Sequence, residues 1–202
     1  MIPKTLSKIG LKTAYGYIEK DPERNLPRLM EWVDRLAGDG PNSFPEQRAA
    51  FRTVINDPDN NMHQLIMNVF REVDNEVIKA VFENFFLNAN IIGWPKQEEL
   101  RAKYNCNIPW AILLDPTSAC NLHCTGCWAA EYGNKLNLTL GEIDCIIHQG
   151  KELGIYMYIY TGGEPLVRKQ DIITLCERHP DCQFLAFTNA TLIDEAFADD
   201  ML

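Results

Sequence analysis

A regular alternation of short apolar runs and amphipathic segments, beginning near residue 109, constrains the fold of this chain more than any other feature. The predicted strands are residues 110–114, 155–160 and 184–187. The helical segments that follow them are residues 139–153, 171–179 and 194–202. Strand and helix alternation of this kind predicts right-handed crossovers and a parallel sheet. Three such units cannot close a barrel, so the sequence predicts an α/β fold that is a partial (β/α) barrel cut short after its third unit.

Local signals mark the ends of these predicted helices. Thr139 and Glu142 have the spacing of a capping box, in which two side chains satisfy free backbone N–H groups at a helix start. Gly154 and Pro180 follow the first and second helices and are typical of helix ends. Asp194 is the predicted cap of the last helix.

The first half of the chain has a helical pattern. Between residues 62 and 86 the apolar positions recur at spacings of three and four, which predicts one long helix whose apolar stripe packs in a core. Shorter helices are predicted at residues 26–37, 46–55 and 96–104. We therefore divide the chain into a helical N-terminal region, residues 1–105, and an α/β core, residues 106–202.

Composition excludes several classes of protein. The net charge of −9 opposes binding to phosphate backbones, so general nucleic-acid binding is not expected. The first residues contain no apolar signal-peptide segment, and no run approaches the roughly 18–20 apolar residues of a membrane helix, so we expect a cytoplasmic protein without membrane contacts. Seven cysteines without a secretion signal disfavour a disulfide framework and favour a metal site.

Three cysteines follow the first predicted strand. Cys120, Cys124 and Cys127 have the spacing C-x3-C-x2-C, which allows their thiolates to converge on one soft metal centre. Three thiolates leave one iron of a cubane cluster free for another ligand, whereas structural zinc takes four protein ligands. The nearby His123 is adjacent to Cys124, which strains simultaneous ligation, and Cys106 is the other candidate for a fourth ligand. The pattern favours a cluster, and a helical interaction protein with structural zinc stays an alternative.

A second motif, Gly162-Gly163-Glu164-Pro165, follows the second predicted strand. The glycines permit close approach of backbone to a ligand, and Pro165 fixes the exit of the turn. Glu164 is a candidate acceptor for a charge-assisted hydrogen bond. An ordinary strand-to-helix turn is the alternative interpretation. Asn189, with Thr188, ends the third strand and is a candidate for contact with ribose or substrate, and a turn that only ends the strand is the alternative.

These motifs, each directly after a predicted strand, closely resemble those of the radical S-adenosylmethionine (radical SAM) superfamily over about residues 109–202. The resemblance implies that the three cysteines hold a [4Fe–4S] cluster and that Gly162, Gly163, Glu164 and Pro165 help to bind S-adenosylmethionine. It further implies reductive cleavage of that cofactor to a 5′-deoxyadenosyl radical, which abstracts hydrogen from the substrate.

A flavodoxin- or ferredoxin-like reductant and a low-oxygen setting would serve this chemistry. Family members usually have an aromatic residue where this chain has Gly126, and Trp128 is the candidate to cover the cluster or the adenine of the cofactor instead. Members also commonly have glycine in place of Ala190.

These residues do not indicate whether the substrate is a peptide or a small molecule. They also indicate no catalytic side chain. A fragment that is catalytically incomplete is a further hypothesis. The four cysteines outside the triad have no mutual spacing and are predicted to be small buried hydrophobic residues: Cys106, Cys145, Cys176 and Cys182.

Overall fold

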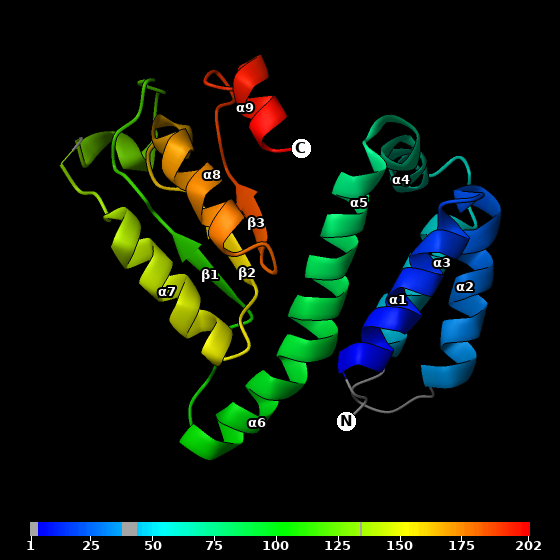
Figure 1. Ribbon diagram of the computed structural model, residues 1–202. Helices are drawn as coiled ribbons and strands as arrows, with labels where there is room; N and C mark the ends of the chain where they lie inside the picture. Colours follow the sequence, from blue (N-terminus) through cyan, green and yellow to red (C-terminus); the bar gives the residue numbers. More distant parts are fainter. Residues whose placement is uncertain (1–3, 38–43, 134) are drawn as a thin grey trace. The chain divides into compact units, whose positions relative to one another are not determined.

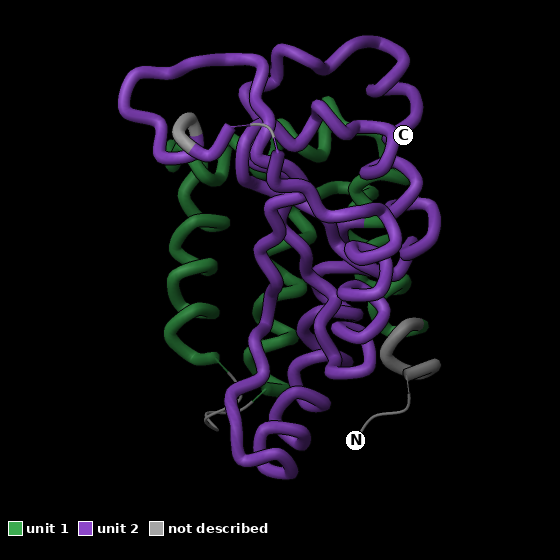
Figure 2. The backbone as a smooth tube through the Cα atoms, turned by 90° about the vertical axis from the view of Figure 1, so that its left-hand side faces the viewer, with its two compact units in different colours: residues 1–80 green, residues 81–202 purple. Residues whose placement is uncertain are grey.

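The computed structural model describes residues 4–37, 44–133 and 135–202. The chain divides into two compact units, residues 1–80 and residues 81–202 (Figure 2). Within the described residues, no helix is both long enough and apolar enough to cross a bilayer.

The first unit consists of helices. Their bounds are α1 Lys4–Ile18, α2 Pro22–Ala37, α3 Pro45–Ile55, α4 Asn61–Glu72 and α5 Asn75–Val81, the last of which ends at the unit boundary. Tyr15, Ile18, Leu26 and Ile55 are buried in this unit. Asp34 on α2 pairs with two arginines of α3, and these hydrogen bonds lower the pKa of its carboxyl. The helices predicted at 26–37 and 46–55 are confirmed.

The long helix predicted over residues 62–86 is wrong, because the chain leaves the helical conformation between α4 and α5. Val73 is extended, and the Asp74 carboxylate accepts a 2.8 Å hydrogen bond from the Glu76 backbone N–H, which starts a new helix. Residues of the predicted stripe such as Met62 and Leu65 are exposed, so the stripe is only partly buried. After α5 the chain continues as a π-helix, η1 Phe82–Gly93.

The second unit contains both helices and strands. η1 and α6 Trp94–Tyr104 pack against the strand-bearing part through polar contacts as well as apolar ones. The Gln97 side chain, fully buried, donates a 2.7 Å hydrogen bond to the Gly154 carbonyl. Asn88 donates a 2.9 Å bond to the Asp181 carbonyl. The boundary between the two compact units therefore lies between residues 80 and 81. The domain boundary near residue 106, which marks the change of sequence pattern, stays a prediction.

Three parallel strands form the sheet, in the order β1 Ala111–Leu114, β2 Met157–Tyr160 and β3 Gln183–Ala186 (Figure 1). Leu114 is in register with Tyr160, and Tyr160 with Ala186. The connecting helices are α7 Leu140–Glu152 and α8 Lys169–Arg178, and α9 Glu195–Asp200 follows β3. The predicted parallel order and the capping box of Thr139 and Glu142 are confirmed. The described strands form an open sheet, so a barrel is not part of this structure.

The two faces of the sheet differ in burial. Tyr158 and Tyr160 are buried in the core beneath α7 and α8, and the Tyr158 hydroxyl donates to the Ile147 carbonyl at 2.9 Å. On the other face Leu113 is 61% exposed and Leu185 is 45% exposed. The first strand is therefore not buried throughout. Because successive side chains of a strand point to opposite faces, Leu113 and Leu185 lie on a face of the sheet that is exposed to solvent near the carboxyl ends of the strands.

Candidate functional site

Loops that follow the three strands meet at one edge of the sheet, as parallel strand order requires (upper end of the sheet in Figure 1). The first loop, residues 115–127, carries the cysteine triad and is called the cysteine loop below. The second loop carries Gly162 to Pro165, and the third carries Thr188 to Asn189. The structure thus brings the three predicted motifs to one place.

The cysteine loop contains a tight turn. The Cys127 N–H donates to the Cys124 carbonyl at 3.2 Å, and Gly126 in this turn has a φ of +75°. This left-handed backbone favours glycine over any residue with a Cβ. The turn therefore gives a physical reason for glycine at the position where an aromatic residue was expected.

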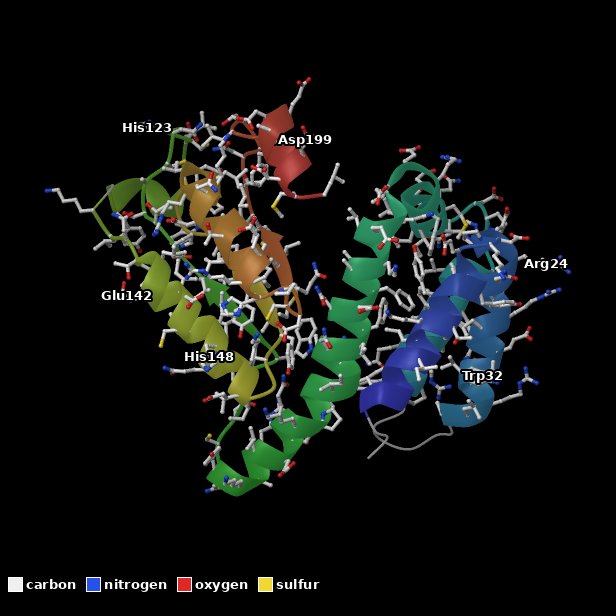
Figure 3. All side chains as sticks on the ribbon, viewed as in Figure 1. Arg24, Trp32, His123, Glu142, His148 and Asp199 are labelled. Atoms are coloured by element: carbon white, nitrogen blue, oxygen red, sulfur yellow. The ribbon has the colours of Figure 1, made fainter. Side chains whose placement is uncertain are left out.

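The three triad cysteines differ in exposure. Cys120 and Cys124 are exposed and Cys127 is half-buried. The Leu122 N–H lies 3.4 Å from Cys120 Sγ, within reach of an N–H···S hydrogen bond. His123, on the same loop, is exposed at its outer edge (Figure 3). The loop thus presents three accessible sulfur donors, a donor set that suits iron in a thiolate-bound cluster.

Among residues 4–37, 44–133 and 135–202, no group of three or more His, Cys, Asp or Glu side chains is arranged to hold a metal ion. The structure places the triad on one loop but does not converge its sulfur atoms. Convergence on a cluster stays a prediction that rests on spacing and donor chemistry.

The remaining cysteines lie away from this loop. Cys182 is buried and Cys176 is half-buried, and burial raises their thiol pKa values to about 12 and about 11. Cys106 and Cys145 are exposed, so the prediction that they are buried is wrong. His148 is also exposed, on the outer side of α7 (Figure 3).

The Gly162–Gly163 backbone packs directly on the cysteine loop. The Gly163 N–H donates to the Thr117 carbonyl at 3.0 Å, and the Glu164 N–H donates to the Ala119 carbonyl at 2.8 Å. A Cβ at position 163 would lie 2.2 Å from the Ala119 carbonyl oxygen. The close approach expected of this motif is therefore made to the preceding loop of the protein, and a ligand contact by these glycines stays a prediction.

The Glu164 carboxylate is 1% exposed and accepts three hydrogen bonds from the protein. Its Oε1 accepts from the Leu166 N–H at 2.8 Å and from the Thr188 hydroxyl at 2.7 Å. Its Oε2 accepts from the Asn189 N–H at 2.8 Å. Pro165 is buried and begins the short helix η3 Pro165–Arg168. Glu164 thus links the second loop to the third, and its contact with S-adenosylmethionine stays a prediction.

Asn189 also contacts the cysteine loop. Its side-chain Nδ2 donates to Asn121 Oδ1 at 3.0 Å, and Asn121 Nδ2 donates to the Thr191 hydroxyl at 2.8 Å. Asn121 was not singled out in the sequence, although its position next to Cys120 was a signal. Arg168, also missed, donates a 2.8 Å hydrogen bond from η3 to the Pro116 carbonyl, and no local pattern predicted this contact.

A cavity of about 610 Å³ opens beside the cysteine loop. Gly162 and Gly163 line it, as do Asp115, Trp128 and Tyr132. Trp128 and Tyr132 are aromatic neighbours. These rings are 5.9 Å apart at an angle of 71°, and Trp128 is 60% exposed. The volume falls within the range of small-molecule sites, which are mostly apolar with a few polar groups. The expected role for Trp128 as a cover for a ligand is compatible with this position.

Comparison with known proteins identifies similarities over this part of the chain. Residues 114–202 match the family model described as the radical SAM superfamily. A GTP 3′,8-cyclase of Shewanella denitrificans is 38% identical over 82 residues, which are 38% of this chain and 24% of that protein.

Two further relatives have similar coverage. An uncharacterized protein of Methanocaldococcus jannaschii is 32% identical over 97 residues, 44% of this chain and 33% of that protein. A GTP 3′,8-cyclase of Tolumonas auensis is 39% identical over 61 residues, 29% of this chain and 18% of that protein. The chain therefore spans a third or less of the length of these relatives. No solved structure matches it with significance.

Proposed function

We propose that residues 114–202, which match the family model of the radical SAM superfamily, hold a [4Fe–4S] cluster and S-adenosylmethionine in a radical SAM enzyme. Cys120, Cys124 and Cys127 supply the thiolates. The observation that supports this most is the pair of backbone hydrogen bonds, at 3.0 and 2.8 Å, that joins the Gly163–Glu164 loop to the cysteine loop. They hold the two predicted cofactor motifs side by side.

When bound, the reduced cluster and S-adenosylmethionine supply a 5′-deoxyadenosyl radical that takes a hydrogen atom from the substrate. The protein groups bind and orient. The Leu122 N–H, donating to Cys120 Sγ, stabilises negative charge on that sulfur. Gly162 and Gly163 line the cavity without side chains, and the Gly163 N–H is bound to the Thr117 carbonyl of the cysteine loop. Trp128 and Tyr132 line the same cavity and offer it two exposed aromatic rings.

The substrate is proposed only by class. Two relatives are named GTP 3′,8-cyclases, and their matched segments are 24% and 18% of those proteins, so GTP is not carried over to this chain. We propose a small molecule or a peptide that enters the cavity beside Trp128. The reductant is proposed to be a flavodoxin- or ferredoxin-like protein, because a cluster of this kind needs a one-electron donor of low potential.

Anaerobic reconstitution with iron and sulfide tests the proposal. Four irons and four labile sulfides per chain are expected, with loss of this content in Cys120→Ala, Cys124→Ala and Cys127→Ala. Cys145→Ala is the matched control, because it removes an exposed thiol outside the triad. One tightly bound zinc ion per chain and no labile sulfide would contradict the proposal and indicate a structural zinc site.

Cofactor cleavage is measured separately, as 5′-deoxyadenosine formed after reduction with dithionite. Cluster uptake without this product would support cluster binding in a catalytically incomplete chain. Product formed equally by the three triad variants would overturn the assignment of the ligands.

A further inference from the structure

We propose that Asn189 is a positioning residue that fixes the cysteine loop through Asn121. This inference rests on the proposed function of the triad and gives Asn189 a role other than the cofactor contact expected from the sequence.

Three side chains form a closed ring of hydrogen bonds. Asn189 Nδ2 donates to Asn121 Oδ1 at 3.0 Å, Asn121 Nδ2 donates to the Thr191 hydroxyl at 2.8 Å, and that hydroxyl donates to Asn189 Oδ1 at 2.7 Å. Each member gives one hydrogen bond to the ring and accepts another. The three bonds lie at the surface, where a single hydrogen bond contributes about 0.5–1.5 kcal/mol.

Most hydrogen-bonding sites of the Asn189 side-chain amide are occupied by these contacts. Its Oδ1 accepts a second bond, from the Thr191 N–H at 3.0 Å, so both lone pairs are occupied. Its backbone N–H is bound to the buried Glu164 carboxylate. The backbone of Asn189 is therefore bound to Glu164 of the second loop, and its side chain is bound to Asn121 of the cysteine loop.

Cys120 lies between two attachments of the cysteine loop. The preceding residue, Ala119, accepts the hydrogen bond from the Glu164 N–H, and the following residue, Asn121, belongs to the ring. Asn189 and Asn121 are 68 positions apart in sequence, so the ring joins the loop after β3 to the residue that follows Cys120. The backbone of Cys120 is thus fixed before metal binds, and binding of the cluster does not need to order it.

Three substitutions break the ring in different ways. Asn189→Ala and Asn121→Ala each remove one amide, and Thr191→Val removes the hydroxyl while keeping the side-chain shape and the backbone N–H. Asn90→Ala is the matched control, since the Asn90 side chain donates to the Phe85 carbonyl within η1, away from these loops.

Hydrogen exchange of the protein without cofactors is the first measurement. Each ring variant is expected to exchange residues 117–127 several-fold faster, with unchanged exchange in α7 and α8 and in the control. Unchanged exchange of residues 117–127 in all three variants would overturn the proposal. This arm does not depend on the triad binding a cluster.

Loss of cluster iron to a chelator is the second measurement, made on the reconstituted protein. Each single variant is expected to lose iron about three- to tenfold faster, the range expected for one hydrogen bond. Asn121→Ala/Asn189→Ala is expected to lose iron no faster than the faster of the two single variants, because either change alone opens the ring.

Equilibrium dialysis with S-adenosylmethionine distinguishes the two roles of Asn189. Cluster-loaded Asn189→Ala is expected to bind S-adenosylmethionine with the wild-type dissociation constant. A tenfold weaker affinity with a wild-type rate of iron loss would make Asn189 a cofactor ligand and overturn the positioning role. If the wild-type protein takes up no cluster, the proposed function fails, and the exchange measurement still decides whether the ring holds the loop.

Discussion

The hydroxyl of Thr188 donates a 2.7 Å hydrogen bond to the buried Oε1 of Glu164, across 24 positions of sequence. This bond joins the loop after β3 to the loop after β2. With the bonds from the Leu166 and Asn189 N–H groups, it leaves the carboxylate surrounded by donors of the protein itself. Glu164 therefore has a structural task at this edge of the sheet, whatever contact a ligand adds.

Glu164→Gln is expected to lower the free energy of unfolding by about 2 kcal/mol, because an amide nitrogen must then face one of three N–H or O–H donors. Urea unfolding followed by circular dichroism measures the change. Glu177→Gln, an exposed position on α8, is the control and should change stability little. Equal stability of Glu164→Gln and wild type would mean that these bonds contribute nothing.

Gly163→Ala is expected to destabilise the protein by about 1–3 kcal/mol and to reduce cluster uptake, because the new methyl would lie 2.2 Å from the Ala119 carbonyl oxygen. The backbone of the cysteine loop must move to admit it. Gly141→Ala on α7 is the matched control, since a Cβ there has no neighbour within 4 Å. Thermal unfolding and iron content of the two variants provide the comparison, and equal values for both would contradict the prediction.

Ala190→Gly is expected to stabilise the protein by up to about 1 kcal/mol. Ala190 has a φ of +62°, a conformation that costs a residue with a Cβ but not glycine. Ala198→Gly in α9, where the backbone is helical, should have the opposite sign because glycine weakens helices. The free energies of unfolding in urea check both signs, and a destabilised Ala190→Gly would show that no strain resides there.

The pair between Asp144 on α7 and His179 at the end of α8 predicts a dependence of stability on pH. Burial acts to raise the pKa of Asp144, but the hydrogen bonds from His179 at 3.1 Å and from Arg178 lower it overall. A carboxyl whose pKa is lower in the folded state stabilises the protein above its unfolded pKa of about 4. That contribution is lost as the pH falls through the folded pKa.

Asp144→Asn is therefore expected to cost about 0.5–1 kcal/mol at pH 7, a modest amount because the carboxylate is 35% exposed. The difference from wild type should disappear by about pH 2. Urea unfolding at a series of pH values measures it, with Asp200→Asn on α9 as a control for loss of charge. A difference that stayed constant down to pH 2 would rule out the ionised carboxylate as its source.

Local sequence determined the elements and the motifs of this protein. The capping box at Thr139 and the location of the triad after β1 were predicted because each depends on residues within a few positions of one another. The parallel sheet was predicted from the alternation of strands and helices along the chain. The similarity of residues 114–202 to the radical SAM superfamily was likewise predicted from short motifs placed after strands.

Tertiary structure decided which groups meet. The ring of Asn121, Asn189 and Thr191 and the donors to Glu164 depend on the register of β1, β2 and β3, which brings distant loops together only after the sheet has formed. The periodic pattern also did not predict that Leu113 is exposed or that the predicted long helix is interrupted at Val73. Periodicity reports which face of an element is apolar, whereas burial and side-chain hydrogen bonds depend on what packs against that face.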